Sequence, residues 1–245
     1  MASSPDELFA LQFGGASVAE NLQRAIDRGD LIETVDGALQ LRPGEGVSRN
    51  WINVDNGPLP DCGFLTYVVF RGAYGGKAVP HGCSACYKVK VAPRTLRELM
   101  AAWDIGKRID CLSKWGVDIG NRYSQDIYAG YYYATGLDGA RLLYRLVREA
   151  TNADPRLGPD VPISIKRGCS EFEAAVGPSD QYSFTPEMAE VEAYLRPKFR
   201  APKLAEADKR VVLRWIETAY QIGDDTYLDF TAGKRLRPKS VSYEP

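Results

Sequence analysis

The sequence predicts an α+β protein, of mixed α/β type, in which helices flank a central mixed sheet and a small helix-helix-hairpin module comes first. Segments with apolar residues at helical spacing are interspersed with short β-branched or alternating segments. Glycine-rich and proline-rich breaks separate many of these segments. The chain has 245 residues, of which 44% are hydrophobic and 26% charged, so it is long enough to bury a large core.

The N-terminal module is predicted to cover residues 1–45. Two Ser-x-x-Glu capping boxes, which begin at Ser4 and Ser17, predict two short helices. An Asp-Gly pair at Asp36 divides residues 31–41 into two short apolar segments, a pattern typical of a β-hairpin. A helix-helix-hairpin order is compatible with nucleic-acid binding, although the second helix carries few basic residues.

The larger domain is predicted to cover residues 46–245, after a linker over 42–50. Residues 64–70 are apolar and β-branched, which predicts a buried strand. Residues 87–91 alternate, which predicts a strand with lysines on its outer face. The elements predicted after these are a helix over 95–116, a strand over 127–133, a helix over 137–150, an edge strand over 161–166, a helix starting at Thr185-Pro186, a helix over 203–222 and a short strand over 227–230.

Four cysteines share one local chemistry. Cys83 and Cys86 form the only C-x-x-C pair, and glycine is adjacent to Cys62, Cys83 and Cys169. Each cysteine lies in a loop at a predicted strand end, where neighbouring backbone N–H groups can approach a thiolate. Cys111 instead follows the apolar spacing of the helix over 95–116, and we expect it to pack in the core.

The spacing favours a metal centre whose ligands are Cys62, Cys83, Cys86 and Cys169. Structural zinc sites usually combine two close pairs of ligands, whereas this chain has one close pair and two remote cysteines. Iron–sulfur sites commonly combine a short C-x-x-C with remote cysteines. The favoured cofactor is therefore a [4Fe–4S] cluster, with zinc as the alternative, and a third hypothesis has no metal and only core cysteines.

His81 is the only histidine in the chain. It could replace one cysteine as a ligand, donate a hydrogen bond to a cluster sulfur, or be an ordinary loop residue. Any Ser/His/Asp or Cys/His hydrolase would have to use it, and the chain has no G-x-S-x-G motif. The sequence thus gives no support to hydrolase chemistry.

The favoured function is electron transfer or redox catalysis by a cluster protein within a complex, and whether the chain is itself an enzyme stays open. The alternatives are a zinc-stabilised nucleic-acid-binding subunit and an interaction protein without metal. A net charge of −1 means that any anionic substrate or nucleic acid must meet a local basic patch. The N-terminal residues lack a signal-peptide pattern, and no segment is apolar enough to span a membrane, so we expect a cytoplasmic protein.

Overall fold

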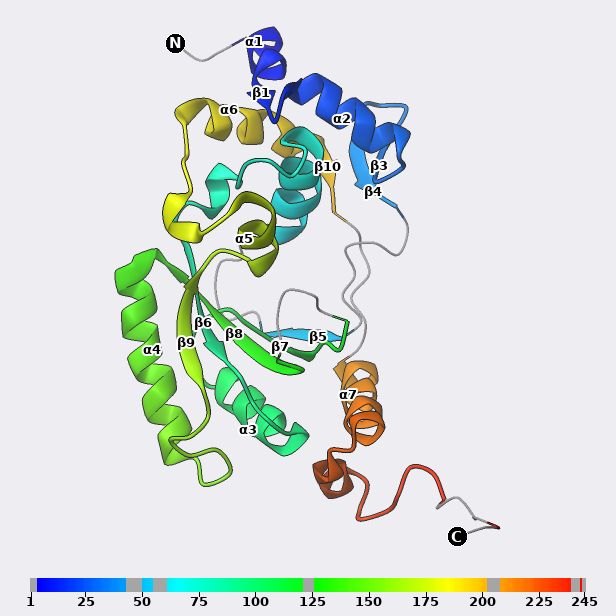
Figure 1. Ribbon diagram of the computed structural model, residues 1–245, viewed down its shortest axis with the longest axis vertical. Helices are drawn as coiled ribbons and strands as arrows, with labels where there is room; N and C mark the ends of the chain where they lie inside the picture. Colours follow the sequence, from blue (N-terminus) through cyan, green and yellow to red (C-terminus); the bar gives the residue numbers. More distant parts are fainter. Residues whose placement is uncertain are drawn as a thin grey trace.

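A five-stranded antiparallel sheet forms the centre of the protein, as a computed structural model shows (Figure 1). The structure describes residues 4–42, 50–54, 61–120, 126–201, 208–238 and 243. The strands lie in the order β5 (Trp51–Val54), β7 (Ser113–Val117), β8 (Tyr128–Thr135), β6 (Cys86–Val91) and β9 (Ile163–Arg167). The α+β class is confirmed, and the central sheet is antiparallel throughout where a mixed sheet was expected.

One face of this sheet is apolar and carries the helices of the lower lobe (Figure 1). α3 (Leu96–Gly106) and α4 (Gly136–Ala153) pack against it, and α7 (Asp208–Ile222) contacts β5 and β7. The helix predicted over 137–150 is therefore confirmed as α4. Alternate residues of each strand enter this core, because successive side chains of a strand point to opposite faces.

Gly130 in β8 makes room for a large ring within this core. The register places it directly opposite Trp115 of β7, whose side chain is fully buried. A Cβ atom added at Gly130 would lie 2.0 Å from Trp115 Cζ3, far inside van der Waals contact. Glycine is therefore required here by an indole ring from the neighbouring strand.

Lysines and tyrosines occupy the opposite face of the sheet. The register pairs Lys88 with Tyr133 and with Lys166, and it pairs Lys114 with Tyr131. We call these five residues the lysine–tyrosine face. The alternation expected along β6 is confirmed, but the lysines do not lie on a solvated face, because a second lobe covers this side and leaves Lys88 only 5% exposed.

The second lobe begins with the predicted N-terminal module. Both capping boxes are present. The hydroxyls of Ser4 and Ser17 each accept a hydrogen bond from a backbone N–H of the first turn, and the glutamate of each box accepts one from the backbone N–H of its serine. The elements of the module are α1 (Pro5–Ala10), β1 (Gln12–Phe13), β2 (Ala16–Ser17), α2 (Val18–Asp27), β3 (Leu31–Glu33) and β4 (Leu39–Leu41). β3 and β4 pair antiparallel, which confirms the hairpin.

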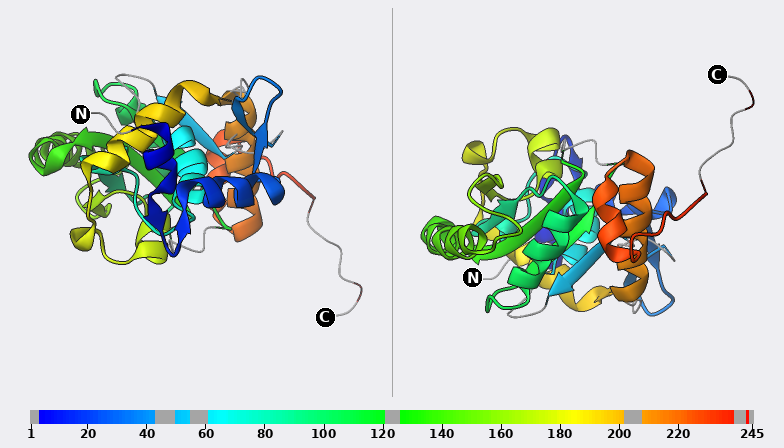
Figure 2. Two further views of the ribbon diagram at one scale, coloured as in Figure 1. Left: turned by 90° about the horizontal axis from the view of Figure 1, so that it is seen from above. Right: turned by 90° about the horizontal axis from the view of Figure 1, so that it is seen from below.

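The module shares its core with segments from later in the chain. Its apolar residues pack in one cluster with η1 (Phe64–Ala73) and α6 (Pro186–Leu195), and β10 (Phe199–Arg200) pairs with β4. Figures 1 and 2 show α1, α2 and α6 together at the end of the molecule away from the sheet. The predicted linker lies almost entirely outside the described residues, and the boundary at residue 45 stays a prediction.

The buried strand predicted over 64–70 is wrong. These residues form η1, a π-helix that continues to Ala73. An apolar segment buried on nearly all sides has no periodicity that separates a strand from a helix. Gly72 allows the helix to approach the module, since an added Cβ would lie 3.1 Å from Leu31 Cδ1 and 3.3 Å from Leu22 Cδ2.

Two further predictions need correction. The helix expected over 95–116 ends at Gly106, where the Trp115 ring packs so closely that a side chain would collide, and β7 follows. The strand expected over 227–230 lies within the 3₁₀ helix η5 (Asp225–Phe230), whose first N–H groups are capped by Asp224. The remaining elements are η2 (His81–Cys83), α5 (Ser170–Val176), η3 (Ser179–Gln181) and η4 (Arg196–Lys198). Within the described ranges, no helix combines the length and apolar character needed to cross a membrane.

Candidate functional site

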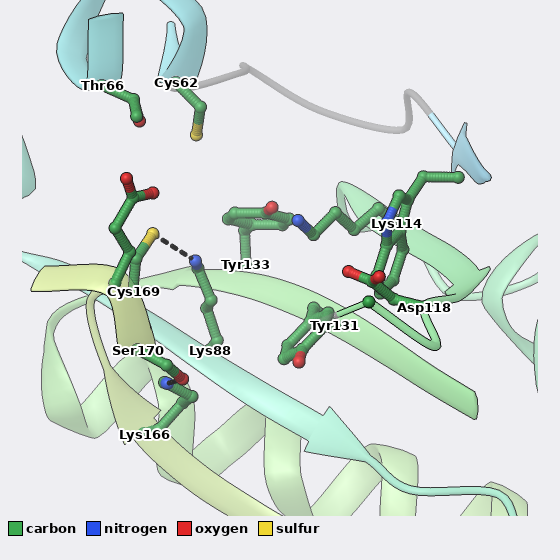
Figure 3. A pocket seen from close by; sticks show the side chains of 13 residues that line it. Cys62, Thr66, Lys88, Lys114, Asp118, Tyr131, Tyr133, Lys166, Cys169 and Ser170 are labelled. Atoms are coloured by element: carbon green, nitrogen blue, oxygen red, sulfur yellow. Dashed lines mark hydrogen bonds between the residues drawn. The ribbon is translucent and has the colours of Figure 1, made fainter. Parts of the chain in front are cut away.

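Four of the five cysteines lie where the two lobes meet. Cys62 lies two residues before η1, Cys83 ends η2, Cys86 begins β6, and Cys169 is the N-cap of α5 just after β9. The Gly168 N–H donates a hydrogen bond to the Cys86 carbonyl at 2.9 Å, which holds the end of β9 beside the start of β6. Figure 3 shows Cys62 and Cys169 reaching toward each other from opposite sides of a cavity.

The four thiols lie close enough to influence each other's ionisation. Burial raises the pKa of the Cys83 thiol, and Cys169, Cys86 and Cys62 raise this pKa further. Burial likewise raises the pKa of Cys62, where Lys88 opposes the shift and Cys169 and Cys86 add to it. Four thiolates could therefore coexist here only with cations or a metal centre to offset their charge.

Cys111 stands apart from this group, and the His81 ring contacts an aromatic ring. Cys111 lies between α3 and β7, where its thiol donates to the carbonyls of Leu112 and Tyr133. The His81 ring packs edge-on against Phe184, with 6.1 Å between ring centroids. The pKa values of Cys62, Cys83, Cys86 and Cys169 thus depend on one another, and Cys111 is not among the described residues that act on them.

Lys88 carries a positive charge into the group of thiols. Its Nζ donates a hydrogen bond to Cys169 Sγ at 3.0 Å, and the ammonium lies over the rings of Tyr133 and Tyr131. Burial raises the pKa of the Cys169 thiol, but Lys88, Lys114 and Lys166 outweigh it, so the pKa ends below its ordinary value. Cys169 is thereby favoured as a thiolate, the form that binds metals and attacks electrophiles.

A cavity of about 410 Å³ opens beside Cys62 and Cys169 (Figure 3). The lysine–tyrosine face forms one wall, and Trp51 of β5 forms another. Burial, followed by the charge of Lys88, lowers the pKa of Lys114 to about 8. Two acidic residues, Asp118 and Glu171, also border the cavity. The site therefore joins thiols, ammonium groups and aromatic rings around one volume.

Arg167 connects the loop of the C-x-x-C pair to the end of β9. Its guanidinium donates to the Ser84 carbonyl at 2.9 Å and to the Ser179 carbonyl at 3.0 Å. Its Nε and the Tyr182 hydroxyl are buried and find no hydrogen-bond partner among the described residues. Burial and then Glu173 raise the pKa of the Tyr182 hydroxyl most, and Cys169 and Cys83 raise it further. Two such donors suit a bound group rich in acceptors.

Glu192 of α6 holds the start of the C-x-x-C loop. Its carboxylate accepts the backbone N–H groups of His81 and Gly82 and the hydroxyl of Tyr74. Burial raises the pKa of Glu192, and the two N–H donors oppose that shift. α6 in the upper lobe therefore fixes the loop that presents Cys83.

Replacing Glu192 by glutamine is expected to lower the free energy of unfolding by about 1 to 3 kcal/mol. A glutamine offers one acceptor oxygen, so buried donors at His81 and Gly82 lose part of their pairing. Urea unfolding would measure the change. The control is Glu217→Gln on an exposed position of α7, expected within about 0.5 kcal/mol of wild type. Equal values for the two variants would contradict this role of Glu192.

The fit of a metal differs between a single ion and a cluster. Among the described residues, no three His, Cys, Asp or Glu side chains come close enough to hold one ion. A zinc ion needs its ligands to meet at one point, whereas in a [4Fe–4S] cluster each cysteine binds a different iron. The described side chains therefore do not form a site for a single ion.

The comparisons with known proteins add no relative: the chain matches no family model, no curated protein and no solved structure.

Sequence reasoning missed three residues of this site. It favoured a solvated position for Lys88, and it gave no role to Glu192 or Tyr182. The sequence does contain a signal for Lys88: two residues apart in one strand, Cys86 and Lys88 lie on the same face of the sheet, so the lysine is expected near the cysteine. Glu192 carries no such signal, since only the folded chain brings α6 beside residues more than 100 positions earlier in the sequence.

Proposed function

We propose that Cys62, Cys83, Cys86 and Cys169 hold one [4Fe–4S] cluster, and that the protein uses it for electron transfer or redox catalysis within a complex. The observation that carries this proposal is the hydrogen bond from the buried ammonium of Lys88 to Cys169, whose charge in turn raises the pKa of Cys62, Cys83 and Cys86. When bound, such a cluster accepts and donates single electrons.

Charge balance supports this assignment. Four thiolates with a cluster form a negatively charged group, which a low-dielectric interior strongly disfavours without nearby cations or dipoles. Lys88 donates to Cys169 at 3.0 Å, and Lys114 and Lys166 further lower the pKa of that thiol. Hydrogen bonds and charges of this kind are also what tunes the reduction potential of a cluster.

The surroundings of the site suit exchange with a partner. Cys62 is an exposed residue and borders the cavity, so solvent reaches this side of the four-cysteine group. A redox partner protein, or a substrate in the cavity, could approach from this side. We place the protein in the cytoplasm, where thiols stay reduced, in agreement with five free cysteines.

Metal and sulfide analysis of protein purified without oxygen tests the proposal. We expect about four iron and four sulfide per chain, with a broad visible absorption that bleaches on reduction. One zinc per chain without sulfide would overturn the cluster and favour the zinc alternative. Protein that binds neither metal after anaerobic reconstitution would leave the four cysteines as core residues.

A further inference from the structure

The cavity beside Cys169 contains the ammonium group of Lys114, which Cys169 and Cys62 influence only through space and with which no carboxylate of the described residues pairs. Lys114 reaches inward from β7, and its Nζ lies 4.7 Å from the centroid of the Trp51 ring and 5.3 Å from that of Tyr131 (Figure 3). Over the described part of the chain, no carboxylate forms an ion pair with Lys114, and its Nζ donates no hydrogen bond. A buried charge of this kind is costly unless something pairs with it.

The other charged groups of the cavity are differently engaged. Lys88 is bound to Cys169, and Glu171 forms an ion pair with Arg71. Lys166 donates a hydrogen bond to Ser170 and pairs with Glu173 at 3.7 Å. Asp118 borders the same cavity and acts on Lys114 only through space, more weakly than burial and Lys88 do. Lys114 is therefore the group best placed to receive an external anion.

The shape of the cavity indicates what accompanies the anion. Its volume of about 410 Å³ falls within the range of sites for small organic molecules. Trp51, Tyr131 and Tyr133 offer aromatic surface around Lys114. A bare inorganic ion would leave this surface uncovered, whereas a planar organic body would bury it.

We propose that the end of this cavity formed by Lys114 and Trp51 binds a small organic anion, with its carboxylate or phosphate on Lys114 and its planar body against Trp51 and the two tyrosines. The cluster would occupy the end beside Cys62 and Cys169. The anion would be the substrate of the site. That role rests on the proposed function, since Cys62 and Cys169 form the neighbouring wall. Binding itself depends only on Lys114 and the aromatic rings.

Titration calorimetry with benzoate and its neutral isostere benzamide tests the site on the wild-type protein. We expect benzoate to bind with a dissociation constant of about 1 mM or tighter, and benzamide to bind at least about tenfold more weakly. Phenyl phosphate, measured in parallel, shows whether phosphate or carboxylate is preferred. Equal binding of benzoate and benzamide, or no binding of any of the three, would overturn the proposal.

The matched variants are Lys114→Gln and Lys209→Gln, the second at an exposed position of α7. Lys114→Gln is expected to weaken benzoate binding at least about tenfold, and Lys209→Gln to leave it unchanged. Equal loss in both variants would argue against the site. Iron and sulfide are measured on the same samples, so that the two proposals can fail separately. Protein that contains the iron but does not bind benzoate would contradict the anion site, and protein that binds benzoate but contains no iron would contradict the cluster.

Discussion

Alanine at Cys62, Cys83, Cys86 or Cys169 is expected to abolish stoichiometric binding of iron and sulfide, whereas alanine at Cys111 leaves it intact. Each of the four thiolates would bind a different iron, so removing one opens the cluster to solvent and loss. Cys111 takes no part, because its thiol is engaged with the carbonyls of Leu112 and Tyr133. Iron and sulfide per chain, determined after anaerobic reconstitution, give the readout.

The Cys111→Ala variant makes this test specific. It removes a half-buried thiol and leaves the four-cysteine group in place, so it reports how much iron is lost through general destabilisation alone. Circular dichroism on every variant confirms that the compared samples are folded. Iron loss in Cys111→Ala equal to that in the other four would contradict the assignment, as would full iron retention in any of those four.

Replacing Gly130 by alanine is expected to destabilise the protein by about 3 kcal/mol. The new Cβ would lie 2.0 Å from Trp115 Cζ3 and 2.2 Å from Trp115 Cε3. The indole is fully buried and itself packs against Gly106 and Tyr132, so it has no space into which to move. Urea unfolding of the purified variant measures the loss.

Gly139→Ala provides the control for this prediction. Gly139 lies in α4, and an added Cβ would meet nothing within 4 Å. Alanine there is expected to raise the free energy of unfolding by about 0.5 to 1 kcal/mol, because it favours the helix. A Gly130→Ala variant as stable as wild type would show that the Trp115 ring can shift, contrary to the packing described.

The sequence predicted correctly those elements that are stabilised by contacts between residues close together in the chain. The capping boxes at Ser4 and Ser17 and the Asp-Gly hairpin are confirmed, since their hydrogen bonds join residues a few positions apart. The strand predicted at 64–70 is wrong because burial on all sides removes periodicity. The helix expected over 95–116 ends at Gly106, and no helical pattern reveals that the later residues pair with β8 as β7.

For the candidate site, too, the sequence marks residues with a local signal and misses those whose contacts are distant in the chain. Glycine beside cysteine marked Cys62, Cys83 and Cys169 without any knowledge of the fold. The hydrogen-bond partners around these thiols are distant in the sequence. Lys88 donates a hydrogen bond to the sulfur of Cys169, 81 residues away, and Glu192 accepts hydrogen bonds from N–H groups 110 and 111 residues away. Antiparallel register and packing between the lobes create those contacts.

The positions of the four cysteines along the chain determine when their site can form. Cys62 and Cys83 lie beside helices of the upper lobe, while Cys86 and Cys169 lie at the ends of β6 and β9. β9 reaches its place beside β6 only after β8 and α4 have been made, and the Glu192 contact requires α6, which follows later still. All four cysteines and the Glu192 contact can therefore come together only after the chain has been synthesised through α6.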